Sequence, residues 1–282
     1  MTGSGGRLVV VATPIGNLGD LPPRAVAELS AADIVACEDT RRTRALLTAA
    51  GVPAPRLLAV HDANEAERCG QVVALLEAGR VVALVSDAGT PAVSDPGHKV
   101  VVAAVAAGCA VTVVPGPSAA VAALVVSGLP TDRFVFEGFL PRKGAERTRR
   151  VAAVAAEPRT TVLFEAPHRV VRTVGDLLAA CGPDRLVALA RELTKVHEEV
   201  WRGTLATLAV RVAEVAPRGE HVLVVGGAPP SPPPTDADIE AALAARLATG
   251  EDRRTAVAAV TTALAVPRRR VYELALRRVS SA

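Results

Sequence analysis

From residue 7 to about residue 114, short runs of apolar residues alternate with segments whose apolar residues recur at helical spacing. Continuous apolar runs of this length predict strands that are buried on both faces. We expect strands at 8–12, 34–37, 57–60, 81–86 and 111–114, and helices at 22–29, 40–50, 65–78 and 97–107. Strands that alternate with helices are typical of βα units, so this part of the chain predicts a mainly parallel sheet.

A Pro-Gly-Pro sequence at 115–117 interrupts this order. Beyond it we expect helices at 119–126, 145–156, 169–180 and 205–215, and strands at 134–136, 161–164, 186–190, 198–202 and 221–225. Here one strand follows another without a helix between them, which favours a mixed sheet.

The clearest boundary is the stretch 228–235, APPSPPPT, which we expect to form an extended spacer. Three short helical patterns follow it, at 238–247, 253–264 and 268–278. The predicted organisation is an α/β domain over 7–116, a second α/β domain over 117–227, a linker over 228–235 and a helical extension over 236–282. The extension is small, so we expect it to dock or to form a compact helical appendage.

Composition limits the classes of function. Half of the residues are apolar, which excludes wholesale disorder. The net charge is only +3, so contact with nucleic acid would need local clusters of cations. Aromatic residues make up 2% of the chain, which argues against a surface that stacks bases in series. The four cysteines are too widely spaced to predict a zinc site or a disulfide scaffold, and no metal centre is expected. No long apolar run predicts a membrane segment, so we expect a soluble cytoplasmic protein.

Three turn-rich stretches follow predicted strands, at 12–20, 86–97 and 115–119. Neither G-x-G-x-x-G nor a P-loop is present. In open α/β sheets ligands bind outside the carboxyl ends of the strands, so we expect these loops to converge on a site. The second stretch exceeds the roughly 2–6 residues of a plain βα connection. We interpret it as a ligand-binding loop, in which Asp95 caps the following helix.

Charged residues crowd two further strand ends, at 164–169 and 190–199. A salt-bridged surface turn accounts for any one of them. Lys195 is one of only three lysines, and an ammonium among carboxylates could hold a phosphate or lower the pKa of a hydroxyl.

Seven motifs occur in order along the chain: TPIGNLGD, CEDTRRT, SDAGTPAVSDPG, PGPSA, FEGFLPRKG, FEAPHR and ARELTKVHEE. Together they resemble the ribosomal small subunit methyltransferase I family of the tetrapyrrole methylase superfamily. The resemblance runs from about Leu8 to Val225, and 253–276 looks like the family's C-terminal extension. It implies two α/β domains of the tetrapyrrole methylase type, with S-adenosylmethionine in the interdomain cleft, a small helical C-terminal extension and a homodimer.

The resemblance also implies an activity, which is S-adenosylmethionine-dependent 2′-O-methylation of a cytidine in the decoding region of 16S rRNA, within the 30S subunit. The family's cofactor loops correspond to residues from both domains of this chain. These are Pro14, Asp87, Ala88, Gly89, Val93, Ser118, Ala119, Phe164 and Leu193.

Methyl transfer from a sulfonium leaves a neutral thioether, so the reaction needs no acid. It does need a group that takes the proton of the 2′-hydroxyl. Our candidates are Glu165 as base and Lys195 as its electrostatic partner, with His168 and Glu192 in reserve.

Phosphate contact requires local positive charge, and three clusters qualify. They are Arg41, Arg42 and Arg44; Arg142, Lys143, Arg147, Arg149 and Arg150; and Arg268, Arg269, Arg270, Arg277 and Arg278. Each could be an ordinary solvated helix face, but five cations within 142–150 exceed the usual surface pattern.

Two other interpretations stay open. The chain could be a methylase of the same superfamily that acts on a small molecule such as a tetrapyrrole, or on a modified protein histidine. It could also be a non-catalytic binder of nucleic acid that uses its tail as a helix-turn-helix, although the tail lacks a clear pattern of polar base-reading residues.

Overall fold

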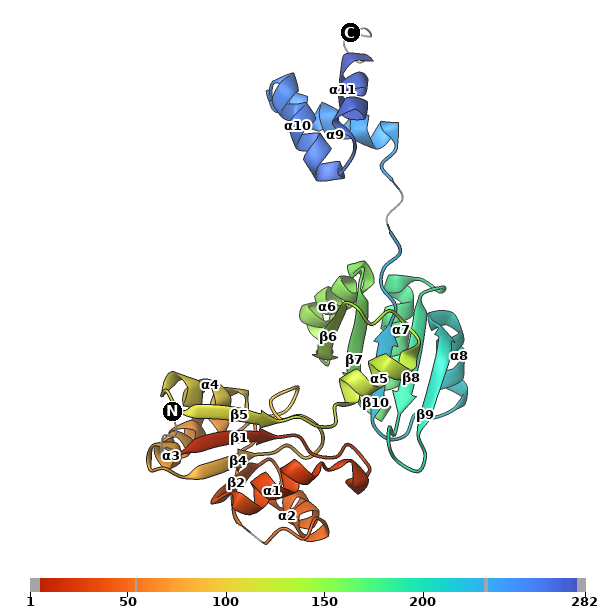
Figure 1. Cartoon of the computed structure of the whole chain (residues 1–282). Helices are drawn as coiled ribbons and strands as arrows, with labels where there is room; N and C mark the ends of the chain where they lie inside the picture. The colour runs from red at the N-terminus through yellow and green to blue at the C-terminus, as the bar shows by residue number, and fades with distance from the viewer. Residues whose placement is uncertain (1–5, 54, 231–232, 278–282) are drawn as a thin grey trace. The chain divides into compact units, whose positions relative to one another are not determined.

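The computed structural model describes residues 6–53, 55–230 and 233–277. Contacts group the chain up to Ala228 into one compact unit and the chain from Pro229 into another. The first unit contains two five-stranded sheets (Figure 1).

The first sheet is entirely parallel, as its apolar strands predict. It consists of β1 (Arg7–Val11), β2 (Ile34–Cys37), β3 (Arg56–Ala59), β4 (Val81–Leu84) and β5 (Ala110–Val114). Their spatial order is β3-β2-β4-β1-β5. The helices are α1 (Pro23–Ala31), α2 (Thr40–Ala49), α3 (Glu65–Glu77) and α4 (His98–Ala106), and a short 3₁₀ turn, η1 (Leu18–Asp20), was not predicted. We call this sheet with α1–α4 the N-lobe.

Successive side chains of β1 point to opposite faces of the sheet, and the N-lobe core therefore has two layers. Leu8 and Val10 pack on one face with residues of α3 and α4. Val9 and Val11 pack on the other face with residues of α1 and α2. Because successive side chains of a strand point to opposite faces, an unbroken run of valines can fill both layers.

The second sheet is mixed, again as predicted. Its strands are β6 (Phe134–Phe139), β7 (Thr160–Glu165), β8 (Leu186–Arg191), β9 (Glu199–Thr204) and β10 (His221–Val225), in the order β6-β7-β10-β8-β9. Only β6 and β7 are parallel, and β10 runs antiparallel to both of its neighbours. Consequently, β10 begins at the edge of the sheet where β7 and β8 end.

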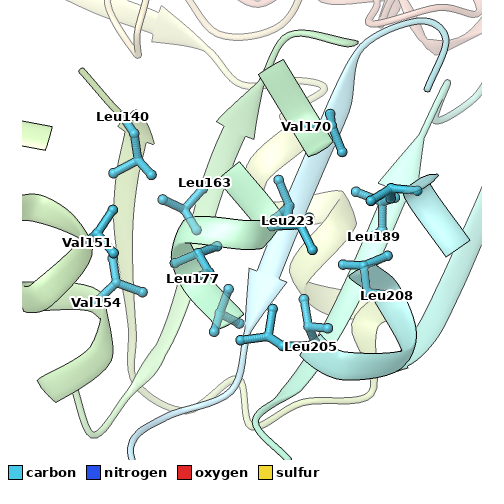
Figure 2. Packing of buried hydrophobic residues seen from close by; sticks show 14 residues of the cluster. Leu140, Val151, Val154, Leu163, Val170, Leu177, Leu189, Leu205, Leu208 and Leu223 are labelled. Atoms are coloured by element: carbon cyan, nitrogen blue, oxygen red, sulfur yellow. The ribbon is translucent and has the colours of Figure 1, made fainter. Parts of the chain in front are cut away.

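Helices cover both faces of the second sheet. One face carries α6 (Gly144–Ala156), α7 (Pro167–Cys181) and α8 (Leu205–Glu214), and the other carries α5 (Ala119–Ser127). Figure 2 shows how Leu163 and Leu223, from neighbouring strands, meet Leu177, Leu205 and Leu208 of the covering helices. We call this sheet with α5–α8 the C-lobe.

The unit from Pro229 onward contains α9 (Asp236–Ala248), α10 (Arg253–Leu264) and α11 (Arg268–Arg277). Buried apolar residues from all three helices, including Ile239, Val257 and Leu274, form a core of their own. Thr235 and Asp238 form a capping box at the start of α9. The extension is therefore a compact helical appendage. None of the helices within the described ranges has the length and hydrophobicity needed to span a membrane.

Candidate functional site

The three turn-rich loops of the N-lobe are joined to one another. Thr13 and Gly89 exchange both backbone hydrogen bonds, with N···O distances of 2.8 and 3.1 Å. The hydroxyl of Thr90 donates to the carbonyl of Pro117 at 3.2 Å. A side chain at Gly89 would contact Ile15 at 3.3 Å, and the backbone there has φ +82°. The loops thus form one continuous rim at the carboxyl ends of the strands, where ligands of open α/β sheets bind.

A cleft of about 510 Å³ lies against this rim. Its wall combines the N-lobe loops with the ends of β7, β8 and β10 from the C-lobe. This volume falls within the range of pockets that hold small-molecule ligands, roughly 300–1,000 Å³.

Most of the residues expected to bind the cofactor line this cleft. They are Asp87, Ala88, Gly89, Val93, Ser118, Ala119, Phe164 and Leu193. Pro14 is not part of the lining and instead follows Thr13, the residue that pairs with Gly89. The structure therefore brings the loops together but gives Pro14 an indirect position.

The second loop has a strained backbone at its tip. Ala92 and Ser94 both have positive φ, at 68° and 60°, which is uncommon for residues with a Cβ. Ser94 also reaches the C-lobe, because a Cβ built on Gly138 would lie 2.9 Å from its hydroxyl. Gly138 sits at the β-bulge between Phe136 and Gly138 of β6, with φ 65°. The loop is thus held in an unusual conformation against the opposite lobe.

The expectation that Asp95 caps the next helix is wrong. Gly97 occupies the N-cap position of α4 and, being glycine, has no side chain that could cap the helix. The capping carboxylate is Glu65, which accepts from the backbone N–H of Gly97 at 2.8 Å and of Lys99 at 2.9 Å. Glu65 is 4% exposed and lies more than thirty residues earlier in the chain. Asp95 is left facing the cleft.

Asp95 and Glu38 both have raised pKa values. Burial raises the pKa of Asp95 to about 6, and the carboxylate of Glu38 adds to the rise. The charges of Asp87 and Glu220 act in the same direction, against a hydrogen bond from Ser86. Burial and then the charge of Asp87 also raise the pKa of Glu38. This end of the cleft is crowded with negative charge.

The proposed base Glu165 lines the cleft, but both of its carboxylate oxygens already bind groups of the protein. One oxygen accepts from Ala166 N at 3.0 Å and pairs with Arg169 at 3.0 Å. The other accepts from the hydroxyl of Thr173 at 2.5 Å. Its side chain has no exposed surface. Glu165 therefore anchors the turn into α7, and the structure corrects its assignment as base.

Lys195 and Glu192 form a pair at the opposite wall. The Lys195 ammonium lies 3.1 Å from Glu192 and 3.6 Å from Glu220. Burial opposes ionisation of Glu192, but hydrogen bonds from Lys195 and the Glu220 backbone hold its pKa below the usual value. Glu192 is thus a stable anion. His168 is exposed at the start of α7 and also lines the cleft.

Sequence reasoning missed several lining residues, notably Glu38, Asp95, Glu220 and His221. Glu38 directly follows β2, so the strand-end argument would have found it. His221 begins β10, and it reaches the cleft only because that strand runs antiparallel to its neighbours. Burial lowers the pKa of His221, whose Nδ1 lies 2.9 Å from the Gly219 carbonyl.

The basic cluster at 142–150 is smaller than the sequence indicates. Arg147 is 4% exposed and bonds to Asp176 at 2.7 Å and to Thr173 at 2.9 Å, so its assignment to an RNA surface is wrong. Arg150 pairs with Glu137. The exposed cations that remain are Arg142, Lys143 and Arg149, and no ion pair within the described ranges involves them.

The other two clusters are partly paired. Arg42 lies 3.3 Å from Asp87 and lines the cleft, whereas Arg41 pairs with Asp39 and is 87% exposed. In the appendage Arg269 pairs with Glu273, and Arg270 pairs with Asp236. Arg268 is exposed. The side chains of Arg277 and Arg278 lie outside the described residues.

The lining as a whole suits a cationic ligand that also has an apolar part. Its ionisable groups are six carboxylates, one arginine, one lysine and two histidines. Ile15, Phe164, Leu193 and Val222 supply apolar surface, and Phe164 packs edge-on against Phe139 at 5.6 Å. S-adenosylmethionine carries a sulfonium, an ammonium, ribose hydroxyls and an adenine ring, so the residues present fit it.

Comparisons with known proteins agree with this arrangement. The family model described as Tetrapyrrole (Corrin/Porphyrin) Methylases matches residues 7–209. The chain is 45% identical to a "Ribosomal RNA small subunit methyltransferase I" of Synechocystis sp., over 96% of this chain and 98% of that protein.

Two solved structures of uroporphyrin-III C-methyltransferase from Thermus thermophilus also match. The first is 27% identical, with a TM-score of 0.55, and covers 78% of this chain and 94% of that one. The second, determined in complex with S-adenyl homocysteine, is 21% identical with a TM-score of 0.54, over 79% and 97% of the two chains. The expectation of two α/β lobes with a helical extension is thereby confirmed.

Proposed function

We propose that this chain, which belongs to the tetrapyrrole (corrin/porphyrin) methylases, methylates ribosomal RNA with S-adenosylmethionine as methyl donor. The observation that carries the proposal is the cleft, whose acidic and apolar lining complements a cationic nucleoside. The named function of the relative from Synechocystis sp., which matches over almost its whole length, supports rRNA as the acceptor.

The finer proposal concerns the acceptor atom. On the seven motifs quoted above, we assign the 2′-oxygen of a cytidine in the decoding region of 16S rRNA, presented by the 30S subunit in the cytoplasm. A ribose hydroxyl is a poor acid, so the chain must supply a group that takes its proton. The cleft contains several carboxylates that could serve.

When bound, S-adenosylmethionine supplies an activated methyl group. The backbone loops at Asp87–Gly89 and Ser118–Ala119, together with Leu193, would hold the donor. The N-terminus of α5 begins at Ala119 and would favour a carboxylate of the ligand. Lys195, held by Glu192, would orient a polar group of the acceptor or the donor. These residues bind and orient the reactants.

The acceptor needs a positive surface outside the acidic cleft. Arg142, Lys143 and Arg149 are exposed, close in sequence and free of ion pairs within the described ranges. Arg41 is also exposed, beside the cleft-lining Arg42. We propose that these cations contact phosphates of the RNA, because phosphate neutralisation dominates such affinities.

A homodimer is part of the same proposal. Strand β5 lies at the edge of its sheet, and Val113 on it is 50% exposed. On α5, which follows β5 in the chain, Val121 and Val125 are 50% and 67% exposed. Exposed valines on consecutive elements favour burial against a second copy of the chain. Sedimentation of the purified protein should give twice the chain mass, and Val125→Asp should lower it.

The alternative acceptor is a small molecule such as a tetrapyrrole, or a protein side chain. A macrocycle would favour a closed apolar pocket, whereas the ionisable residues of this cleft include six carboxylates. This lining argues against a macrocycle, whereas RNA is favoured by the exposed cations Arg142, Lys143 and Arg149.

The experiment is transfer of tritiated methyl from S-adenosylmethionine into 30S subunits that lack the modification, followed by mapping of the label. We expect label in 16S rRNA, on the ribose of a cytidine in the decoding region. Label at another rRNA position would overturn the finer proposal only. An absence of rRNA label, from a preparation that binds S-adenosylmethionine, would overturn the assignment of rRNA as acceptor.

A further inference from the structure

We propose that Asp95 is the general base of this methyl transfer and takes the proton of the acceptor hydroxyl. The inference rests on the proposed function and adds to it the group that carries out proton removal. Asp95 lines the cleft, is half-buried, and follows the strained tip of the second loop.

Two of the other cleft carboxylates are already engaged by donors. Glu165 accepts from Ala166 N and Thr173 and pairs with Arg169. Glu192 accepts from Lys195 at 3.1 Å and from the Glu220 backbone at 3.0 Å. These donors occupy the carboxylate oxygens that would have to receive the proton of the acceptor hydroxyl.

Asp87 is likewise held by donors, and two other carboxylates are poorly placed. Asp87 accepts from the Asp39 backbone at 3.1 Å and pairs with Arg42 at 3.3 Å. Glu220 is 79% exposed and pairs with Lys195. Glu38 lines the main cleft and also a second cavity beside Asp39, whereas Asp95 follows the strained tip of the loop that packs against Gly138.

The loop holds Asp95 in place from both sides. Before it, Ser94 has φ 60° and packs close to Gly138 of the C-lobe. After it, the buried Glu65 carboxylate binds the N–H groups of Gly97 and Lys99. Strained backbone that persists because its surroundings fix it is typical of functional sites. A base restrained in this way is pre-organised for the reaction.

The charges that face Asp95 suit it to accept a proton near neutral pH. Burial and the carboxylates of Glu38, Asp87 and Glu220 disfavour its ionised form, and only the hydroxyl of Ser86 favours it. Glu38 directly follows β2, Ser86 and Asp87 lie just after β4, and Glu220 directly precedes β10, and all but Ser86 line the cleft. The pKa of about 6 lies close to the operating pH, where general bases are most effective.

In the proposed step, the methyl group moves from sulfur to oxygen and the hydroxyl proton moves to Asp95. The acceptor hydroxyl oxygen forms a bond to the methyl carbon of S-adenosylmethionine as the carbon–sulfur bond breaks, and the bonding electron pair stays on sulfur. The hydroxyl proton passes to the ionised carboxylate of Asp95. The products are the methyl ether, a neutral thioether and protonated Asp95, which then releases its proton to solvent.

The test is single-turnover methylation of 30S subunits by the full chain between pH 5 and 9. For the wild type we expect a rate that rises with pH to a plateau, with a midpoint near 6. Asp95→Asn should lower the plateau rate by about 10²-fold or more, which is the usual contribution of a general base. It should also abolish the acid limb, which is the rise of the rate with pH below the plateau. Its affinity for S-adenosylmethionine, measured by calorimetry, should fall by much less than the rate does, because five other carboxylates of the cleft remain. Asp132→Asn, at an exposed loop position outside the cleft, is the matched control.

A second variant keeps the proposal testable if Asp95→Asn does not fold. Glu38→Gln removes the neighbouring charge that raises the pKa of Asp95 most, so the pH at which the rate is half its plateau value should move to lower pH. An unchanged limb in Glu38→Gln, or a normal limb and rate in Asp95→Asn, would overturn the role of Asp95. Loss of the limb in His168→Ala instead would assign the base to that residue. Failure of the wild type to label rRNA would refute the proposed function, which is a different outcome from either of these.

Discussion

Glu65 and Asp95 both belong to the structure around the loop after β4: Asp95 lies in the loop, and Glu65 binds the backbone where the loop ends. Both are carboxylates, but their surroundings move their pKa values in opposite directions. Burial opposes ionisation of Glu65, yet hydrogen bonds from Gly97 and Lys99 outweigh it and lower the pKa. Asp95 has only the hydrogen bond from Ser86 on this side of the balance, so burial raises its pKa. The sequence places Asp95 three residues before the start of α4 but gives no sign that the cap comes from Glu65, because that contact depends on tertiary packing.

Asp95→Asn should stabilise the protein at neutral pH. The folded-state pKa of Asp95 is raised from its ordinary 3.8 to about 6, so its ionised form destabilises the fold. This penalty is absent below about pH 4, grows as pH rises to about 6, and is constant above that. The melting temperature of Asp95→Asn should therefore exceed that of the wild type more at pH 7.5 than at pH 5. A pH-independent difference would contradict the assigned burial.

Glu65→Ala should destabilise the chain. It leaves the buried N–H of Gly97 and the part-buried N–H of Lys99 without their acceptor, and hydrogen bonds to a charged group contribute about 1.5–3 kcal/mol each. We expect a loss of about 3 kcal/mol in the free energy of unfolding by urea. Glu67→Ala, at an exposed position of the same helix, is the control and should change stability by less than about 0.5 kcal/mol. Equal effects of the two substitutions would rule out the capping role.

At the scale of elements, hydrophobic periodicity predicted the strands and helices of both lobes and of the appendage. Their ends differ by a few residues, as for β6, predicted at 134–136 and observed at Phe134–Phe139. The extra length depends on the bulge at Gly138, which apolar spacing alone does not indicate. The strand-end rule located most of the cleft but not His221, because a strand that enters the site by its first residue is outside that rule.

Gly16→Ala tests the contact between the first loop and the C-lobe. An added Cβ would lie 2.4 Å from Lys195 Cγ and 3.0 Å from the Leu193 carbonyl. The loop or the Lys195 side chain must shift, and overpacking of this kind typically costs about 1–3 kcal/mol. We expect affinity for S-adenosylmethionine to fall by about tenfold in calorimetry.

Gly70→Ala is the matched control for this substitution. Gly70 lies within α3 with nothing near its missing Cβ, so alanine there should stabilise the helix by about 0.5–1 kcal/mol. It should leave the affinity for the donor unchanged. If Gly16→Ala also binds normally, the first loop does not shape the donor site.

At the scale of the whole molecule, charge is divided between an acidic cleft and an exposed basic surface at the start of α6. The cleft suits a cationic donor, whereas Arg142, Lys143 and Arg149 suit a polyanionic acceptor. The sequence indicated the basic cluster but could not separate its exposed members from Arg147, because side-chain burial depends on how α6 packs on α7. The sequence also left open whether the extension docks or forms a compact appendage, and the structure gives it a core of its own.

The basic surface formed by Arg142, Lys143 and Arg149 predicts that the affinity for RNA depends on salt. Replacing Arg142, Lys143 and Arg149 together with alanine should weaken binding to 30S subunits and reduce the slope of log K against log salt by about one for each lost phosphate contact. Filter binding between 50 and 300 mM salt measures this. Arg147→Ala should instead lower the melting temperature, because it removes a buried pair with Asp176. Wild-type affinity of the triple variant at every salt concentration would exclude this surface.

The most direct test of the account is the electron density of a crystal grown with S-adenosylmethionine. The account predicts one donor molecule per chain between the loop at Asp87–Gly89 and the loop at Leu193–Lys195, with its methyl group facing the space beside Asp95. Density for the donor at a different place, or an empty cleft in a protein that calorimetry reports as saturated, would contradict it.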